Sequence, residues 1–430
     1  MFCMRLFEGA KAWDDVHMKS TGGSNPHTES GTFRYGLRMS DPVADSVLMF
    51  VLAIVGALMI FRLGFEFSKV VFPEYRPMFG DFISFWTASF FVLEGAAAEA
   101  YNFSLVNEFQ LETFDQGELP FLYPPTWLMV VSPFSMLPYR PSALLFEALQ
   151  VIALVVACRY LLRDRLILWI LIVFPAVISG IIHGQNAVLN TALLAGALGA
   201  LDRDRPVLAG ILIGLLSYKP QLGILIPFAL LAGREYRAFA SAAVTTLLFA
   251  AISWVIFGTE VWRAFIETIA FAREWLESGH TPANKYASIL GWLRQFGVGN
   301  TAGMIVQVGF ALASFGAVIW SWRQDLPMTI KGSLLVIGAC LSTPYLLDYD
   351  LALLVIPVLL LIQQGNETGY LSFEKFSIAL AVFSFLFTSL WGVQMPVTAI
   401  GVPSIVLFAL VLRRAVVGQR AVLRKTSCPA

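Results

Sequence analysis

The chain has 430 residues, of which 57% are hydrophobic and only 13% are charged, and its mean hydropathy is +0.72. A soluble domain of this length needs far more charge to cover its surface, so the composition excludes that class and indicates an integral membrane protein. The 29 Lys and Arg residues balance the 29 Asp and Glu residues, and this lack of a basic excess argues against nucleic acid as a partner.

The first apolar segment long enough to cross a bilayer, which takes about 20 residues, covers roughly 43–63. In the loop that follows, 62–124, the pieces 82–93 and 104–114 have helical periodicity with apolar faces, so we predict amphipathic helices at the membrane interface. The next apolar piece, 126–137, is too short to cross and is predicted to be re-entrant.

The rest of the chain predicts further spans, some shorter than a full crossing, as is typical where broken helices line a cavity. They lie near 142–161, 166–182, 186–201, 206–218, 220–233, 236–258, 301–322, 329–346, 350–363, 373–392 and 397–412. The fold class is therefore all-α, a multi-pass membrane protein with about twelve transmembrane segments. A second large loop, 259–300, is rich in Trp and carries Arg263, Arg273, Lys285 and Arg294.

Basic residues gather at alternate ends of these spans and set the orientation. They include Arg34, Arg38, Arg159, Arg163, Arg165, Arg203, Arg205, Arg234, Arg237, Arg323, Arg413, Arg414, Arg420, Arg424 and Lys425. With these ends in the cytoplasm, the polar segment 1–40 is a disordered cytoplasmic tail, 41–418 is the membrane domain and 419–430 is a second cytoplasmic tail. Both large loops, 62–124 and 259–300, then face outward.

Polar residues interrupt the apolar pattern at five joints, which this topology brings to the outward side. The joints are Asp81, Tyr123-Pro124-Pro125, His183-Gly184-Gln185-Asn186, Lys219-Pro220-Gln221 and Tyr345-Leu346-Leu347-Asp348-Tyr349-Asp350. A purely structural membrane protein has no need to gather polar groups on one face. We therefore expect a single extracytoplasmic site.

Asp81 stands between a glycine and a run of aromatics, where an ionised side chain is costly without a partner or a task. Partial desolvation raises the basicity of a carboxylate, which suits Asp81 to act as a general base on a hydroxyl. The alternative is that Asp81 caps the helix that begins at Phe82.

The other joints supply candidate substrate-binding groups. Tyr123 lies in a turn that the prolines make rigid, and the alternative is a turn with no ligand contact. Gln185 and Asn186 follow a glycine at a helix start and could hold a sugar or phosphate oxygen, or simply cap a turn. His183 beside them is interpreted as structural, because no second histidine lies at ligand spacing.

Lys219, followed by Pro220 and Gln221, separates two apolar half-helices. Ionisable groups at membrane depth usually have a partner, and a phosphate is the natural one at a broken helix. The alternative is that Lys219 snorkels to the surface.

Asp348-Tyr349-Asp350, just after Tyr345, has the Asp-X-Asp spelling that binds a divalent cation in nucleotide-sugar enzymes. The pattern is short, and Asp202-Arg203-Asp204 shows it in a plain solvated turn. We therefore predict no metal site and no cofactor, and treat Asp348 and Asp350 as substrate-binding residues; the alternative of Mg²⁺ or Mn²⁺ stays open.

Taken together and in order, the motifs resemble glycosyltransferase family 87, whose members depend on polyprenyl-phosphate sugars. The motifs are Gly80-Asp81-Phe82, Phe121–Pro125 with Pro133 and Leu137-Pro138, Gly184–Asn186, Gly210 to Gln221, and Pro344-Tyr345 to Asp348–Leu351. The resemblance covers about residues 43–415. It departs from some members near the last motif, where they have a histidine and this chain has Tyr345, Leu346 and Leu347.

This resemblance implies a GT-C type fold and transfer of a hexose, typically mannose, from a polyprenyl phosphate to a lipid or glycan acceptor. It places the reaction on the periplasmic face of a bacterial inner (plasma) membrane, with Asp81 as the base. Because a phosphate leaves readily, one base and cations that hold the phosphate suffice, and direct displacement predicts inversion. The competing classes are a lipid or solute transporter or flippase, which shares broken helices, and a membrane scaffold.

Overall fold

The computed structural model describes residues 42–71, 77–162, 166–277, 285–385 and 401–427. The predicted tail 1–40 lies outside this described part. Within it the chain forms helices and no strand, apart from an isolated antiparallel bridge between Tyr286 and Leu347. Six of these helical segments are long and apolar enough to cross a membrane. The predicted all-α, multi-pass class is confirmed.

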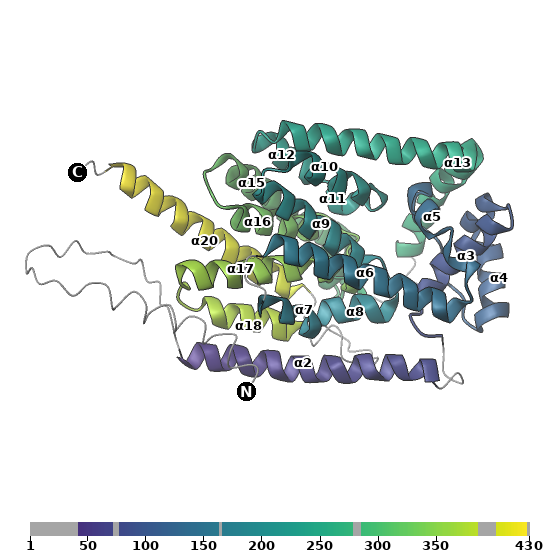
Figure 1. The fold of residues 1–430 in the computed structure, drawn as a ribbon, viewed down its shortest axis with the longest axis horizontal. Helices are drawn as coiled ribbons and strands as arrows, with labels where there is room; N and C mark the ends of the chain where they lie inside the picture. The colour runs from purple at the N-terminus through teal and green to yellow at the C-terminus, as the bar shows by residue number, and fades with distance from the viewer. Residues whose placement is uncertain (1–41, 72–76, 163–165, 278–284, 386–400, 428–430) are drawn as a thin grey trace, which may run out of the picture.

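The six long segments lie among shorter helices, with α2 and α13 along opposite sides of the molecule (Figure 1). They are α2 (Pro42–Val71), α6 (Tyr139–Leu161), α13 (Tyr236–Glu277), α15 (Asn300–Arg323), η6 (Asp348–Leu354) with α17 (Val355–Thr368), and α20 (Val402–Ser427). The shorter elements are α3 (Phe82–Leu93), η1 (Ala97–Tyr101), α4 (Phe103–Phe114), α5 (Pro125–Val131), η2 (Phe134–Met136), η3 (Leu166–Trp169), α7 (Ile170–Val173), α8 (Pro175–His183), α9 (Ala187–Asp202), α10 (Pro206–Leu215), η4 (Leu216–Tyr218), α11 (Pro220–Gly223), α12 (Ile226–Ala232), α14 (Ile289–Arg294), α16 (Met328–Ser342) and α18 (Glu374–Ser384).

Prolines divide several predicted spans. The span predicted at 166–182 consists of η3, α7 and α8, and Pro175 starts α8 one residue after Phe174, which follows α7. The span predicted at 220–233 is likewise divided into α11 and α12. A proline has no backbone N–H to donate, so it is tolerated in the first turn of a helix and ends the preceding one.

Beyond the predicted end of the span at 258 the chain is helical again, and α13 continues to Glu277. Gly258, with φ 78° and ψ 178°, bends the chain inside α13, and helix resumes after it. The second part of α13 packs on the outer loop, where the ring of Phe103 lies against those of Phe271 and Trp275. Apolar residues recur at helical spacing in the sequence after Gly258, and some of them make this contact.

The predicted helix 82–93 is present, and much of it packs inside the fold. The segment is helical, as expected, but the first residues of α3 are buried, and Phe82, Ile83 and Phe85 are fully enclosed. Rings of Trp127 and Phe146 pack around Phe85. The helix is thus an inner wall of the fold rather than a surface element.

Opposite ends of the bundle differ in character. In Figure 1, α3, α4 and α5 gather at one end, and α20 extends at the other. Far from α3, the C-terminal helix is fixed by Arg414, whose guanidinium donates to both carboxylate oxygens of Glu374. Lys375 forms an ion pair with Asp45 of α2, so that α2, α18 and α20 are tied together.

Candidate active site

Asp81 stands on a turn that three other residues hold in place. Phe79 in this turn has a positive φ of 55°, which is uncommon outside glycine. Its N–H donates to the buried carboxylate of Glu66 at 3.1 Å, and the hydroxyl of Tyr139 donates to its carbonyl at 2.9 Å. The N–H of Asp81 donates to the carbonyl of His183 at 2.9 Å. The backbone that carries Asp81 is therefore anchored to α2, α6 and α8.

Gly184 allows α8 to approach this turn. It has φ +76°, and a Cβ built on it would lie 2.7 Å from the carbonyl oxygen of Phe79 and 2.9 Å from Cβ of Phe82. Only glycine fits a position that needs both a left-handed backbone and this close contact. The approach brings the next residue, Gln185, against Asp81.

The side chain of Asp81 binds Gln185 and does not cap its helix. Although Asp81 is the N-cap residue of α3, its side chain makes no capping hydrogen bond. The amide of Gln185 donates to Oδ2 of Asp81 at 3.2 Å, and the hydroxyl of Tyr123 donates to Oε1 of Gln185 at 3.0 Å. Within the described residues, no donor reaches Oδ1 of Asp81, so this oxygen can accept a proton.

Tyr123 is suited to remain a donor in this chain of hydrogen bonds. Burial raises the pKa of its phenol well above the usual value, and the carboxylates of Asp350 and Asp81 raise it further. The backbone of Tyr123 is held in turn, because its carbonyl accepts a hydrogen bond from the hydroxyl of Tyr101 at 3.0 Å. The hydroxyl of Tyr123 fixes the orientation of the Gln185 amide, and with it the contact between that amide and Asp81.

A buried ion pair lies next to this chain. Nζ of Lys219 is 2.5 Å from Oδ1 of Asp350, and both side chains are almost completely buried. Lys219 also donates to Oδ1 of Asn186 at 3.5 Å and lies 5.2 Å from the ring centre of Tyr349. The other carboxylate oxygen of Asp350 accepts the N–H of Leu347. The alternative that Lys219 snorkels to the surface is therefore wrong.

Asp348 faces a different set of groups. Its Oδ2 lies 3.9 Å from Nε2 of His183, and its Oδ1, which is buried, has no hydrogen-bond partner in the described part of the chain. The guanidinium of Arg62, near the end of the first span, interacts electrostatically with Asp348. The bridge between Tyr286 and Leu347 lays the loop that contains Tyr286 beside the Asp348 segment. Lys285 is the residue before Tyr286 in the sequence.

The structure thus brings most of the predicted site residues together, from five separate segments. Hydrogen bonds and chain neighbours connect six of them: Asp81, Tyr123, Gln185, Asn186, Lys219 and Asp350. Asp348 lies two residues before Asp350 in the sequence. Two predicted residues have no such contact among the described residues. Tyr345 is 45% exposed, and its backbone N–H donates a hydrogen bond to the hydroxyl of Thr343. Gln221 makes no hydrogen bond to the other predicted site residues in the described part of the chain.

The two aspartates of the Asp-X-Asp pattern do not converge, since Asp348 faces His183 and Asp350 faces Lys219. In the described ranges, no group of three or more His, Cys, Asp or Glu side chains could hold a metal ion.

Sequence reasoning missed two residues near the site. Arg62, at the start of the predicted loop 62–124, was given no role, and His183 was interpreted only as structural. An arginine at the outward end of a span, opposite to most of the other basic residues, was a signal that could have identified Arg62.

Comparison with known proteins places these residues in a wider context. The sequence model of glycosyltransferase family 87 matches residues 121–344, slightly more than half of the chain. Two curated relatives, from Mycobacterium tuberculosis strains CDC 1551 / Oshkosh and ATCC 25618 / H37Rv, are both named "Alpha-(1->3)-arabinofuranosyltransferase". Each is 28% identical over 229 residues, which is 49% of this chain and 50% of the relative, so the chain spans about half their length. No solved structure matches.

Proposed function

The chain belongs to glycosyltransferase family 87, and on this premise we propose that it transfers a sugar from a polyprenyl-phosphate donor to a lipid or glycan acceptor. We place the reaction on the extracytoplasmic side of a bacterial inner (plasma) membrane. The observation that carries the proposal is the carboxylate of Asp81, which is oriented by Gln185 and Tyr123 and keeps one oxygen without a donor among the described residues. Asp81 lies where polar side chains from five segments of the described chain meet.

Asp81 is the general base of the proposed reaction. Its Oδ1 takes the proton of the acceptor hydroxyl as that oxygen attacks the anomeric carbon. The bond between this carbon and the phosphate oxygen breaks, and polyprenyl phosphate leaves with the electron pair. Because one displacement takes place from the face opposite the phosphate, the product has inverted configuration.

The departing phosphate requires cations, and Lys219 alone is a poor source of charge because Asp350 neutralises it. We assign Lys219 to holding the site together and to sharing a hydrogen bond with the ligand. Arg62 and Lys285, one interacting with Asp348 and the other beside the bridge to Leu347, are the further cations that stabilise the phosphate.

Two donor sugars are candidates. The resemblance described above favours a hexose, mannose in particular. The printed name of the curated relatives favours arabinofuranose as a second candidate, at 28% identity over half of their length. Polyprenyl phosphates that carry each sugar, labelled in the sugar, distinguish the two when added to membranes that contain the protein.

The deciding experiment compares the wild type with Asp81→Asn in such membranes. A general base contributes roughly 10²–10⁴-fold to a rate, so transfer should fall by at least 100-fold while the donor still binds. Asp115→Asn is the matched control, because Asp115 is an exposed carboxylate of the same outer loop and should have no effect. Transfer by Asp81→Asn at the wild-type rate would remove Asp81 from the role of base.

The same assay tests the transporter or flippase hypothesis. A flippase moves the intact lipid across the bilayer and forms no new glycosidic bond. Mass spectrometry of the lipids would then show labelled donor on the opposite leaflet and no labelled product. That outcome would overturn the proposed function even though the polar cluster remained as described.

A further inference from the structure

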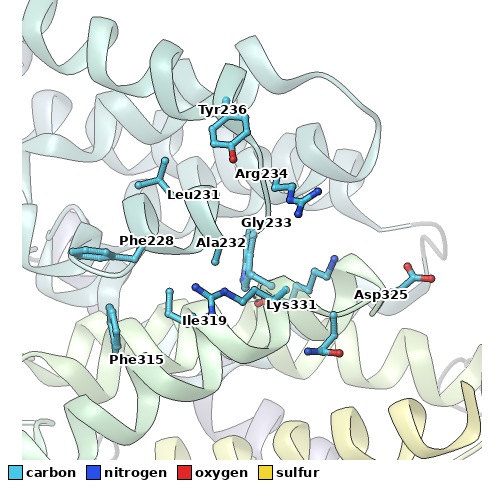
Figure 2. A pocket seen from close by; sticks show the side chains of 13 residues that line it. Phe228, Leu231, Ala232, Gly233, Arg234, Tyr236, Phe315, Ile319, Asp325 and Lys331 are labelled. Carbon is cyan, nitrogen blue, oxygen red and sulfur yellow. Dashed lines mark hydrogen bonds between the residues drawn. The ribbon is translucent and has the colours of Figure 1, made fainter. Parts of the chain in front are cut away.

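A pocket of about 980 Å³ lies between the α12–α13 turn and the facing helices α15 and α16. Figure 2 shows apolar side chains at one side of it, among them Phe228 and Phe315, and charged side chains at the other, among them Arg234 and Lys331. The rings of Phe228 and Phe315 meet edge to face at 5.2 Å and form the wall of the apolar half. The pocket therefore has an apolar part and a charged part.

This pocket is at the end of the bundle that lies away from Asp81. Helix α16 runs from Met328, next to the pocket, to Ser342, which leads to the Asp348 segment. Its 15 residues at about 1.5 Å each give a separation of roughly 20 Å along the helix. The pocket is thus distinct from the candidate active site.

The charged part is basic. Arg234, Arg323 and Lys331 line it together with one carboxylate, Asp325. A second carboxylate, Glu235, does not line the pocket but interacts electrostatically with Lys331. Three cations and one carboxylate therefore line the pocket, and two of the cations, Arg234 and Arg323, have exposed side chains. An anion is the complementary ligand.

The apolar part faces outward from the bundle. Phe228 is 47% exposed, Leu231 42% and Phe315 37%. In a chain whose long helices cross a membrane, exposed apolar side chains of this kind contact acyl chains. A basic recess between membrane helices, next to an acyl-facing wall, is the arrangement that binds anionic lipid head groups.

We propose that this pocket binds one anionic phospholipid, with its phosphate against Arg323 and Lys331 and an acyl chain along Phe228 and Phe315. The lipid bridges α12 and α15, which contact each other here. It holds this end of the bundle together and does not take part in sugar transfer, so the proposal is independent of the proposed function.

The test uses the full chain in vesicles of phosphatidylcholine, with or without phosphatidylglycerol, and counts retained lipids by native mass spectrometry. We expect one phosphatidylglycerol to remain bound. The double variant Arg323→Gln with Lys331→Gln should lose it by about tenfold or more, since each basic residue near a membrane surface contributes about fivefold to affinity. The control double variant, Arg205→Gln with Arg237→Gln, removes the same charge near the start of α10 and α13, outside the pocket lining.

Three outcomes overturn the proposal. Equal retention of phosphatidylcholine and phosphatidylglycerol would mean that the pocket does not select charge. An equal loss in both double variants would mean that only the general surface field attracts the lipid. Displacement by soluble glycerol phosphate as effective as by the lipid would assign the pocket to a free phosphate. An unchanged unfolding temperature of the variants in phosphatidylcholine shows that they fold.

Discussion

Lys219 and Asp350 form a buried ion pair between two elements that lie 131 residues apart in the sequence, with Nζ 2.5 Å from Oδ1. The pair joins the break after η4 to the start of η6. Asn186 accepts from the same ammonium, so that the start of α9 is drawn into the contact. Each of the segments that meet at the candidate site is thereby fixed to at least one other.

Removing one partner of this pair should destabilise the protein strongly. Lys219→Met or Asp350→Asn leaves a buried charge without its counter-charge, and such changes cost about 3–5 kcal/mol. The double variant removes both charges, so its loss should be clearly smaller than the sum of the two. Unfolding of purified protein in detergent, followed by helical circular dichroism, measures this, and strictly additive losses would contradict the pairing.

Tyr123→Phe should slow transfer with little effect on folding. The change removes the hydroxyl that orients the Gln185 amide, and one such hydrogen bond is worth about 1 kcal/mol, or roughly fivefold in rate. Because burial raises the pKa of Tyr123, the wild-type hydroxyl keeps its proton, and the ratio of the two rates should stay constant up to about pH 10. Tyr160→Phe, which loses a hydroxyl with no partner among the described residues, is the control.

Gly184→Ala should disturb Asp81 more than it disturbs the fold as a whole. The new Cβ would clash with the carbonyl of Phe79. The alanine would also have to adopt a left-handed backbone conformation, which costs about 1–3 kcal/mol. The turn that carries Asp81 then has to shift, and transfer should fall by at least tenfold. Gly223→Ala, where a Cβ meets nothing within 4 Å, should leave both activity and unfolding temperature unchanged.

Arg414→Gln should lower stability but leave the transfer rate of the folded protein intact. The guanidinium of Arg414 donates to both oxygens of Glu374 and to the carbonyl of Gly369, and its loss leaves a buried carboxylate uncompensated at a cost of about 3–5 kcal/mol. Arg413→Gln is the matched control, since that arginine is exposed at its contact with Ser372. A change in transfer rate per folded molecule would show that this end communicates with Asp81.

The sequence predicted the class of fold and the approximate place of most helices, because long apolar runs and prolines are visible directly. It also pointed to the segments that meet around Asp81, because each carries a polar residue in an apolar context. It could not give their pairing: an ammonium such as Lys219 is compatible with a phosphate, a carboxylate or the membrane surface until its neighbours are known.

The burial of α3 could not be read from the sequence for a related reason. Twelve residues of mostly apolar character suit an interfacial helix and an interior one equally well, since periodicity does not tell lipid from protein on the far side. Only the packing of Trp127 and Phe146 around Phe85 decides it. The extension of α13 depends in the same way on a partner, Phe103, that is distant in sequence.

The shortness of α10 has a consequence for the depth of the reaction. The ten residues of α10 and three of η4 rise by about 21 Å from Arg205 to Lys219. The hydrocarbon layer is about 30 Å thick, so a helix that starts at one border leaves Lys219 roughly 9 Å short of the other. Under the proposed function, a lipid-borne sugar would sink below the head groups to meet Lys219, and the enclosing helices rather than the aqueous phase would govern how much water accompanies it.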